Sequence, residues 1–150
     1  MKKKVYLASP FFNAKEISVV EYVAKRLRNL GFDVYSPREH EVENAWALPN
    51  KEWAKKVFDA DIKAINEADI VVVINFGMYS DTGTAWECGY AYGIGKKVKM
   101  VLAENIITES PLPSTYSLMM INSCHHFENI NDFDSIIKSI GKYDFEQNKG

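Results

Sequence analysis

Long apolar runs are missing from this sequence of 150 residues. The longest aliphatic run is Ile70–Ile74, whereas a helix needs about 20 apolar residues to cross a bilayer. The apolar stretch that follows Lys2–Lys4 is also too short for a secretory leader, because Ser9 and Pro10 interrupt it. These absences predict a cytoplasmic protein without a membrane span.

Cysteine is scarce, and positive charge is not in excess. Cys88 and Cys124 form no CxxC pair and no zinc-ligand pattern, so we expect two small buried side chains rather than a disulfide or a metal site. Lysine and arginine total 18 against 20 aspartates and glutamates, which gives a net charge of -2. A nucleic acid polymer is held mainly by a surplus of Lys and Arg, so this balance argues against such a partner.

Several motifs of well-known chemistry are also absent. The sequence contains no G-x-x-x-x-G-K-[ST] phosphate loop and no G-x-S-x-G nucleophile elbow. The glycines of segment 89–95 fall inside or at the end of an expected helix, so they do not form a dinucleotide fingerprint. His125 and His126 are adjacent on an expected strand and point to opposite faces, which makes a poor metal site. We expect neither a metal nor a cofactor.

What the sequence does contain is the composition of one folded domain, with 47% hydrophobic and 25% charged residues. Short β-rich runs alternate with helical periodicity. We expect strands at 4–8, 32–35, 70–74, 98–102 and near 126–127, and helices at 17–30, 52–67, 84–94, 117–121 and 132–140. This alternation predicts a single α/β flavodoxin-like domain over residues 1–150, a five-stranded parallel sheet doubly wound by helices. Ligands of such sheets bind beyond the carboxyl ends of the strands.

The segment after the strand at 70–74 carries two carboxylates, Asp81 and Glu87. We place Glu87 in the first turn of a helix, where the helix dipole and unpaired backbone N–H groups would keep it ionised, as a nucleophile requires. Both residues also have a structural interpretation. Thr84 to Glu87 fits a T-x-x-E capping box, and Asp81 fits a turn-forming aspartate. Taken alone, this segment favours the structural interpretations.

Other residues could face the same crevice. Asp59 and Asp61 cannot share one helix face, so one of them could point to the crevice and the other to solvent, or both could be solvated. Tyr6 lies inside the first strand, where core packing is the common role, but a buried hydroxyl still needs a partner. Phe11 and Trp53 could form an apolar wall for a flat ligand, although such residues more often belong to the core.

These residues occur in a characteristic order along the chain. The matching segments are Val5–Phe12, Ser36–Glu39, Trp53 with Asp61 eight residues later, Ala68–Ile70, Asp81–Ala91 and Ser117–Met119. The set resembles the nucleoside 2-deoxyribosyltransferase family from Val5 to about Phe127. Its most specific part is the Asp-x-Gly-x-x-x-Glu-x-Gly segment that begins at Asp81.

The resemblance implies a role for each matching residue. Glu87 would be the nucleophile that attacks the anomeric carbon, Asp61 the carboxyl group that exchanges protons with the base, and Tyr6 the hydrogen-bonding partner of the nucleophile. The implied substrate-binding residues are Asp81 at the sugar hydroxyl far from the base, Gly83 in the same motif, Phe11 and Trp53 along the base, and Ser117 and Met119 lent by a neighbouring subunit.

The resemblance implies an enzyme of nucleoside salvage. It would transfer 2-deoxyribose reversibly between purine or pyrimidine bases, through a covalent deoxyribosyl-Glu intermediate and with retained configuration. Its partners would be deoxyribonucleosides, free nucleobases and copies of itself, as a dimer or a dimer-built tetramer or hexamer with a shared site. The chemistry parallels a retaining glycosidase, so Asp61 must be protonated for part of the cycle, which requires a raised pKa.

One position departs from the family pattern. Ser117 stands where the family usually has Asn, and a hydroxyl there resembles 2'-deoxynucleoside 5'-monophosphate N-glycosidases, which release the base to water. Asp81 argues against that alternative, because a carboxylate at the 5' end of the sugar would repel a phosphate. A non-catalytic nucleotide-binding module with the same fold is a further alternative.

Overall fold

The computed structural model describes residues 2–40, 50–77, 81–103 and 116–130. The elements follow in the order β1 (Lys4–Ala8), α1 (Ala14–Asn29), β2 (Asp33–Tyr35), the 3-10 turn η1 (Pro37–Glu39), α2 (Asn50–Glu67), β3 (Ile70–Asn75), α3 (Thr82–Gly93), β4 (Lys97–Leu102), α4 (Leu118–Ser123) and β5 (His126–Asn129). The helix expected at 132–140 lies outside the described residues.

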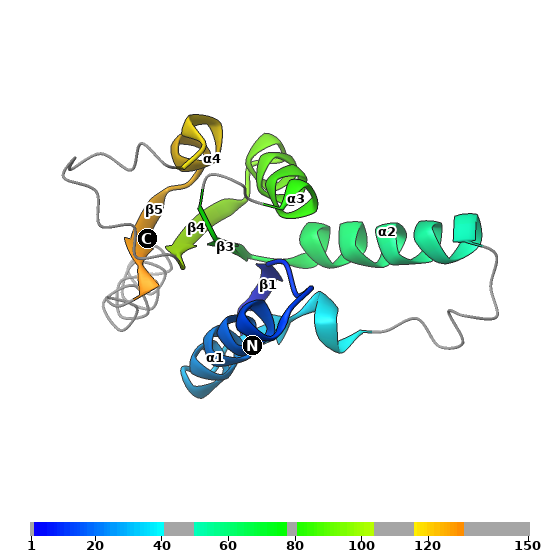
Figure 1. Cartoon of the computed structure of the whole chain (residues 1–150), viewed down its shortest axis with the longest axis horizontal. Helices are drawn as coiled ribbons and strands as arrows, with labels where there is room; N and C mark the ends of the chain where they lie inside the picture. Colours follow the sequence, from blue (N-terminus) through cyan, green and yellow to red (C-terminus); the bar gives the residue numbers. More distant parts are fainter. Residues whose placement is uncertain (1, 41–49, 78–80, 104–115, 131–150) are drawn as a thin grey trace.

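The five strands form one sheet in the order β2-β1-β3-β4-β5, and every neighbouring pair is parallel. Helix α1 lies on one side of this sheet, and α2, α3 and α4 lie on the other (Figure 1). The predicted α/β fold, a parallel sheet wound by helices on both faces, is confirmed. The strand order reverses between β1 and β3, which creates the switch point where ligands of such sheets bind.

Alternation along the strands sends side chains into two hydrophobic clusters. Val5 and Leu7 pack with α1 on one face, while Tyr6 and Ala8 pack with α2 and α3 on the other. All six residues of β3 are buried, as expected for a strand that is covered on both faces. Tyr6 thus enters the cluster that lies beneath the helices α2, α3 and α4.

Helix α1 begins and ends at the residues that its sequence favours. The Asn13 side chain accepts a hydrogen bond from the Glu16 backbone N–H at 2.9 Å, and the Glu16 carboxylate accepts one from the Phe12 N–H at 2.9 Å. This reciprocal pair satisfies donors that have no partner within the helix. Gly31, expected as the C-terminal cap, has φ +93°, a conformation that glycine adopts without strain.

The turn η1 was not expected from the sequence. Two ion pairs join it to α1: Arg28 donates to Glu39 at 2.9 Å, and Arg38 lies 3.0 Å from Glu21. Both pairs join residues at least eleven positions apart, so no local pattern predicts them. The turn fixes how the chain leaves the carboxyl end of β2.

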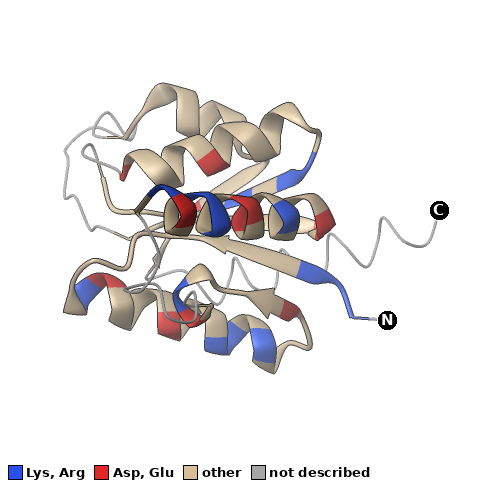
Figure 2. Ribbon diagram, turned by 90° about the vertical axis from the view of Figure 1, so that its right-hand side faces the viewer, with Lys and Arg blue, Asp and Glu red and all other residues tan. Residues whose placement is uncertain are grey.

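Charged residues of both signs alternate along the same helices in the view of Figure 2. This distribution fits the nearly balanced composition of the chain. In the part of the chain that the structure describes, no helix is both long enough and apolar enough to cross a membrane.

Candidate active site

A cavity of about 590 Å³ opens between α2 and α3, within the usual size range of small-molecule sites. Helix α2 contributes one wall and the first two turns of α3 the other. The lining residues are mostly apolar but include two carboxyl groups: Trp53, Ala54, Val57, Phe58, Asp61, Ile62, Ile65, Thr82, Gly83, Trp86 and Glu87. Four of the residues expected from the sequence therefore line one cavity, namely Glu87, Asp61, Trp53 and Gly83.

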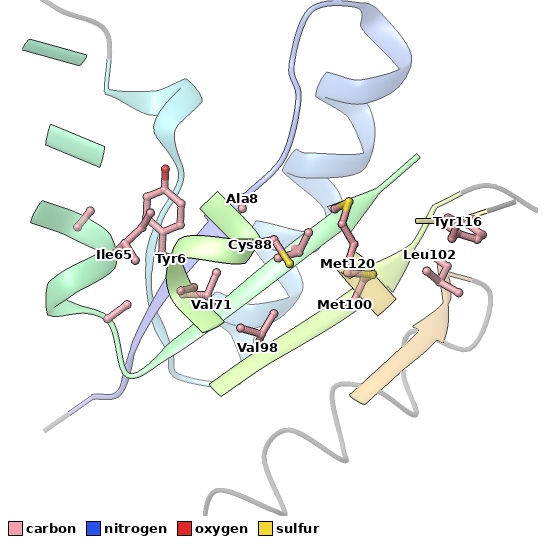
Figure 3. Close-up of a cluster of buried hydrophobic side chains, with 14 residues drawn as sticks. Tyr6, Ala8, Ile65, Val71, Cys88, Val98, Met100, Leu102, Tyr116 and Met120 are labelled. Atoms are coloured by element: carbon pink, nitrogen blue, oxygen red, sulfur yellow. The ribbon is translucent and has the colours of Figure 1, made fainter. Parts of the chain in front are cut away.

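Tyr6 and Glu87 are joined directly. The Tyr6 ring is fully buried, and it stacks on Tyr35 with ring centroids 5.7 Å apart. Its hydroxyl points away from the other labelled side chains of the hydrophobic cluster (Figure 3). The hydroxyl donates a hydrogen bond to Glu87 Oε2. Tyr6 is thus both a core residue and the hydrogen-bonding partner that holds one oxygen of the Glu87 carboxyl group in place.

The expected capping role of Glu87 is wrong. Helix α3 begins at Thr82, two residues earlier than expected, and its N-cap is Asp81. The Asp81 carboxylate accepts hydrogen bonds from the Thr84 backbone N–H at 2.8 Å and from the Thr84 hydroxyl at 3.0 Å. Glu87 consequently lies in the second turn, and the Tyr6 hydroxyl is the partner that its carboxyl group meets. The capping alternative for Glu87 is therefore removed.

The environment of Glu87 favours its neutral form. The pKa of this carboxyl group is raised from 4.5 to about 7, mainly by burial and less by the charges of Asp61 and Asp81, while the Tyr6 hydrogen bond opposes the rise. We expected a carboxylate kept ionised by the end of the helix. That expectation is wrong because Glu87 lies beyond the first turn and is enclosed by apolar walls. The same environment raises the pKa of the Tyr6 hydroxyl.

Asp61 faces the cavity, and Asp59 does not. Asp59 forms an exposed ion pair with Lys55 at 2.8 Å, on another side of α2. Burial raises the pKa of Asp61 from 3.8 to about 6, and the charge of His40 counteracts part of this rise. This is the raised pKa that we expected for a carboxyl group that supplies a proton to a base.

Asp81 and Gly83 form a compact corner at the start of α3. A Cβ atom on Gly83 would lie 3.2 Å from Asp81 Oδ2, the oxygen that caps the helix. Glycine at this position leaves room for the capping carboxylate and keeps the cavity open beside it. Asp81 is therefore a helix cap rather than a simple turn residue, and both hydrogen bonds that it accepts from Thr84 use Oδ2.

Four expected substrate-binding residues do not line the cavity, namely Asp81, which directly precedes its lining residue Thr82, and Phe11, Ser117 and Met119. Phe11 stacks on Phe12 with ring centroids 5.9 Å apart and does not line the cavity. Ser117 is the N-cap of α4, where its hydroxyl accepts from the Met120 N–H at 3.4 Å. Met119 is 83% exposed. The structure thus gives Ser117 a local role and leaves the Met119 side chain facing outward.

Sequence reasoning missed two aromatic residues of the site. Phe58 and Trp86 line the cavity from opposite walls, with ring centroids 5.6 Å apart. Both could have been found from spacing, because Phe58 precedes Asp61 by three residues on its helix and Trp86 follows Gly83 by three on the next. His40, whose charge acts on the pKa of Asp61, was also not singled out from the sequence. Its ring stacks on Tyr35 at a centroid distance of 4.0 Å.

The histidine pair near the C-terminal strand has structural partners. His125 Nδ1 accepts a hydrogen bond from the Val98 N–H at 3.1 Å, and His126 Nε2 lies 3.3 Å from Glu128. Among the described residues, no group of three His, Cys, Asp or Glu side chains is arranged to hold a metal ion.

Comparisons with known proteins agree on one family. The family model described as nucleoside 2-deoxyribosyltransferase matches residues 5–130. The solved structure of a 2-deoxyribosyltransferase from Bacillus psychrosaccharolyticus is 39% identical, with a TM-score of 0.73 over 87% of this chain and 89% of that one. A curated nucleoside deoxyribosyltransferase from Lactobacillus johnsonii is 32% identical over 63 residues, which span 42% of this chain and 42% of that relative.

A more distant structure shares the fold. The CMP N-glycosidase of Clostridium botulinum is 23% identical, with a TM-score of 0.59 over 94% of this chain and 99% of that one. The family match covers most of the chain and includes Tyr6, Asp61, Asp81 and Glu87. This protein belongs to the nucleoside 2-deoxyribosyltransferase family.

Proposed function

We propose that this protein transfers 2-deoxyribose between nucleobases through a covalent ester on Glu87. The observation that carries the proposal is a buried carboxyl group, hydrogen-bonded to Tyr6, in an apolar cavity that also contains Asp61. Two carboxyl groups with different roles are the requirement of retaining glycosyl transfer. The 39% identical 2-deoxyribosyltransferase supports the same reaction class.

The proposed first half-reaction makes one bond and breaks one. A Glu87 carboxylate oxygen attacks the anomeric carbon of the deoxyribose, and the bond from that carbon to the base nitrogen breaks. Asp61 gives its proton to the departing base, so that the base leaves as a neutral molecule. In the second half-reaction another base attacks the same carbon, Glu87 is released, and Asp61 recovers a proton from the incoming base.

The two raised pKa values let the pair share one proton, although the higher pKa of Glu87 makes the opposite arrangement, with Glu87 protonated, the commoner one. Asp61 has a pKa of about 6 and Glu87 of about 7, so the pair holds about one proton between these pH values. The reaction needs one carboxylate and one carboxylic acid at the same time. We propose that the arrangement with Glu87 ionised and Asp61 protonated is the reactive one.

The shape of the cavity supports recognition of an uncharged nucleoside. Trp53, Phe58 and Trp86 offer flat apolar surfaces for a base. Asp81 directly precedes the lining residues Thr82 and Gly83, and its carboxylate would accept a hydrogen bond from the 5'-hydroxyl of a sugar that extends to this edge of the cavity. Phe11 would contact the base only where the ligand extends beyond this cavity toward the end of β1.

A shared site between subunits is part of the proposal. Leu118 and Met119 are 71% and 83% exposed, so α4 offers apolar side chains that a neighbouring copy could receive. We propose that Ser117 and Met119 complete the site of a neighbouring subunit in a dimer or a dimer-built assembly. Size-exclusion chromatography with light scattering should give at least twice the chain mass, and Met119→Glu should lower that mass.

The single domain over residues 1–150 and the cytoplasmic location stay predictions from the sequence.

The alternative is hydrolysis of 2'-deoxynucleoside 5'-monophosphates. Ser117 favours it, because a hydroxyl stands where the family usually has an amide. Asp81 opposes it, since its carboxylate would meet the phosphate with like charge. A non-catalytic nucleotide-binding module would bind nucleosides without releasing a base.

One incubation separates these possibilities. Purified protein is mixed with 2'-deoxyuridine and adenine in phosphate-free buffer, and the products are resolved by chromatography. The proposal predicts 2'-deoxyadenosine together with an equal amount of uracil. Uracil without 2'-deoxyadenosine would indicate a hydrolase, and no reaction with nucleosides but base release from 5'-monophosphates would support the alternative.

A further inference from the structure

Lys96 lies in the short connection between α3 and β4, at a place that the proposed reaction does not use. Its ammonium group donates hydrogen bonds to two backbone carbonyl oxygens, those of Asn66 and Ala68, at 2.8 Å each. These carbonyls lie at the C-terminal end of α2, which ends at Glu67. The last carbonyls of a helix have no partner within it, and the helix dipole favours a cation there. Lys96 therefore caps the C-terminal end of α2.

The same residue also caps the end of α3. The Lys96 backbone N–H donates to the Ala91 carbonyl oxygen at 2.9 Å, and Gly95 before it has φ +79°. The Gly95 N–H donates to the Tyr92 carbonyl oxygen at 3.1 Å. This is the Schellman type of helix end, in which a residue of positive φ turns the chain back onto the last turn. Lys96 thus joins the ends of the two helices that form the walls of the cavity.

A second contact joins the two helices at the same end. The Tyr90 hydroxyl, on α3, donates a hydrogen bond to Asn66 Oδ1 at 2.7 Å. The Tyr90 ring stacks on Trp86 with ring centroids 5.3 Å apart, and Trp86 in turn contacts Phe58 of α2. Asn66 is therefore held through its side chain by Tyr90 and through its carbonyl by Lys96.

Helix α2 packs on the rest of the protein mainly near this end. Its two buried residues, Ala64 and Ile65, both lie in its last turn. The other end of α2 extends away from the sheet (Figure 1). The cavity-lining residues that precede Ala64 on this helix therefore depend on the contacts at its C-terminal end for their position.

We propose that Lys96 is a positioning residue for Asp61. It holds the end of α2 against α3 and so sets the distance between Asp61 and the Glu87 nucleophile. Asp61 lies five residues before Asn66, about 7.5 Å along the helix axis, so a small tilt of α2 moves its carboxyl group. Lys96 does not line the cavity, so it acts through Asp61 and not on the substrate. This inference rests on the proposed function, in which Asp61 gives a proton to the departing base.

The test compares 2'-deoxyuridine with 5-fluoro-2'-deoxyuridine, with adenine as acceptor. Fluorine withdraws electrons from the base, so 5-fluorouracil leaves more readily and depends less on the proton from Asp61. In Lys96→Met, kcat/KM for 2'-deoxyuridine should fall about ten-fold, because a misplaced proton donor slows the reaction. The ratio of the 5-fluoro value to the 2'-deoxyuridine value should rise about three-fold. A merely structural loss would lower both values equally and leave this leaving-group ratio unchanged.

Three further variants make the result interpretable. Lys96→Arg keeps two donors for the carbonyls and should retain a leaving-group ratio close to that of the wild type. Tyr90→Phe loses the hydrogen bond to Asn66 but keeps its stacked ring, so it should raise the ratio and replaces Lys96→Met if that variant unfolds. Lys63→Met is the matched control, since it removes a positive charge from an exposed side chain of α2, 4.0 Å from Glu67, and its ratio should equal that of the wild type.

Asp61→Asn separates this inference from the proposed function, because it should raise the leaving-group ratio more than Lys96→Met does. If Asp61→Asn raises the ratio, but folded Lys96→Met and Tyr90→Phe keep the wild-type ratio, the role of Lys96 is overturned while the proposed function stands. An unchanged ratio in Asp61→Asn would contradict Asp61 as the proton donor, and the role of Lys96 with it. A wild-type protein that exchanges no base would overturn the proposed function itself.

Discussion

At the scale of single residues, the Tyr6 hydroxyl opposes the effect of burial on Glu87. Burial favours the neutral carboxyl group, and the hydrogen bond from Tyr6 favours the carboxylate. Without this bond, the pKa of Glu87 would rise, and the difference between the pKa values of Glu87 and Asp61 would become larger. The reactive arrangement, with Glu87 ionised and Asp61 protonated, would then become rarer.

Tyr6→Phe tests this balance. The wild-type profile of kcat/KM against pH should be bell-shaped, with limbs near the pKa values of about 6 and 7 given by Asp61 and Glu87. Because Glu87 has the higher pKa, it governs the alkaline limb. The variant keeps the buried ring but loses the hydroxyl, so its alkaline limb should move to higher pH and its maximum should fall.

The control for this measurement is Tyr92→Phe, an exposed tyrosine on the same helix as Glu87. Its profile should superimpose on that of the wild type. If Tyr6→Phe also superimposed on the wild type, the hydrogen bond would have no effect on the ionisation of Glu87.

At the scale of elements, the first turn of α3 combines helix capping with proposed substrate binding. Asp81 caps the helix through Oδ2, and the same residue would meet the sugar. The two roles can be separated because asparagine caps a helix about as well as aspartate but carries no charge.

The free energy of unfolding of Asp81→Asn should lie within about 0.5 kcal/mol of the wild-type value, whereas that of Asp81→Ala should be lower by about 0.5–2 kcal/mol. Asp81→Asn should nevertheless lower kcat/KM for 2'-deoxyuridine about ten-fold, because a hydrogen bond to a charged acceptor is lost. It should also improve the use of 2'-deoxyuridine 5'-monophosphate relative to 2'-deoxyuridine, since the like charge is gone. Chemical denaturation and steady-state kinetics give these values, and full nucleoside activity in folded Asp81→Asn would remove Asp81 from the site.

Much of the fold could be predicted from the sequence, and the failures have physical reasons. β3 was predictable because a continuous aliphatic run requires burial on both faces. The start of α3 was not, since Asp81 and Thr84 are both good N-caps and only the observed bond selects Asp81. The bond between Tyr6 and Glu87, 81 residues apart, was expected only from the family resemblance, because no local pattern reports such a contact.

At the scale of the whole molecule, the site should lower stability near neutral pH. Glu87 has an ordinary pKa of 4.5 and a raised pKa of about 7 in the folded protein. Below pH 4.5 the group is protonated in both states and opposes folding little. Between pH 4.5 and about 7 the unfolded chain releases this proton while the folded protein still holds it, so the folded state loses stability as the pH rises, and the loss levels off above pH 7. Asp61 acts in the same direction over a lower range.

Glu87→Gln should therefore abolish base exchange and stabilise the protein at pH 8. Glutamine keeps an acceptor for the Tyr6 hydroxyl but cannot ionise, so the gain should be about 1–3 kcal/mol at pH 8 and close to zero at pH 4.5. Thermal or chemical unfolding at both pH values measures it. Glu67→Gln is the matched control, because Glu67 is exposed and pairs only loosely with Lys63 at 4.0 Å. An equal gain in both variants would show that burial of Glu87 is not the cause.

The central claim is that Glu87 carries the deoxyribose between the two bases. The most direct measurement incubates the protein with 2'-deoxyuridine without an acceptor base, stops the reaction with acid, and determines the intact mass and the modified peptide. We predict a mass increase of one 2-deoxyribosyl group, located on Glu87, that disappears when adenine is added before the acid and is absent in Glu87→Gln. Uracil release with no added mass, or a deoxyribosyl group on another residue, would contradict the claim.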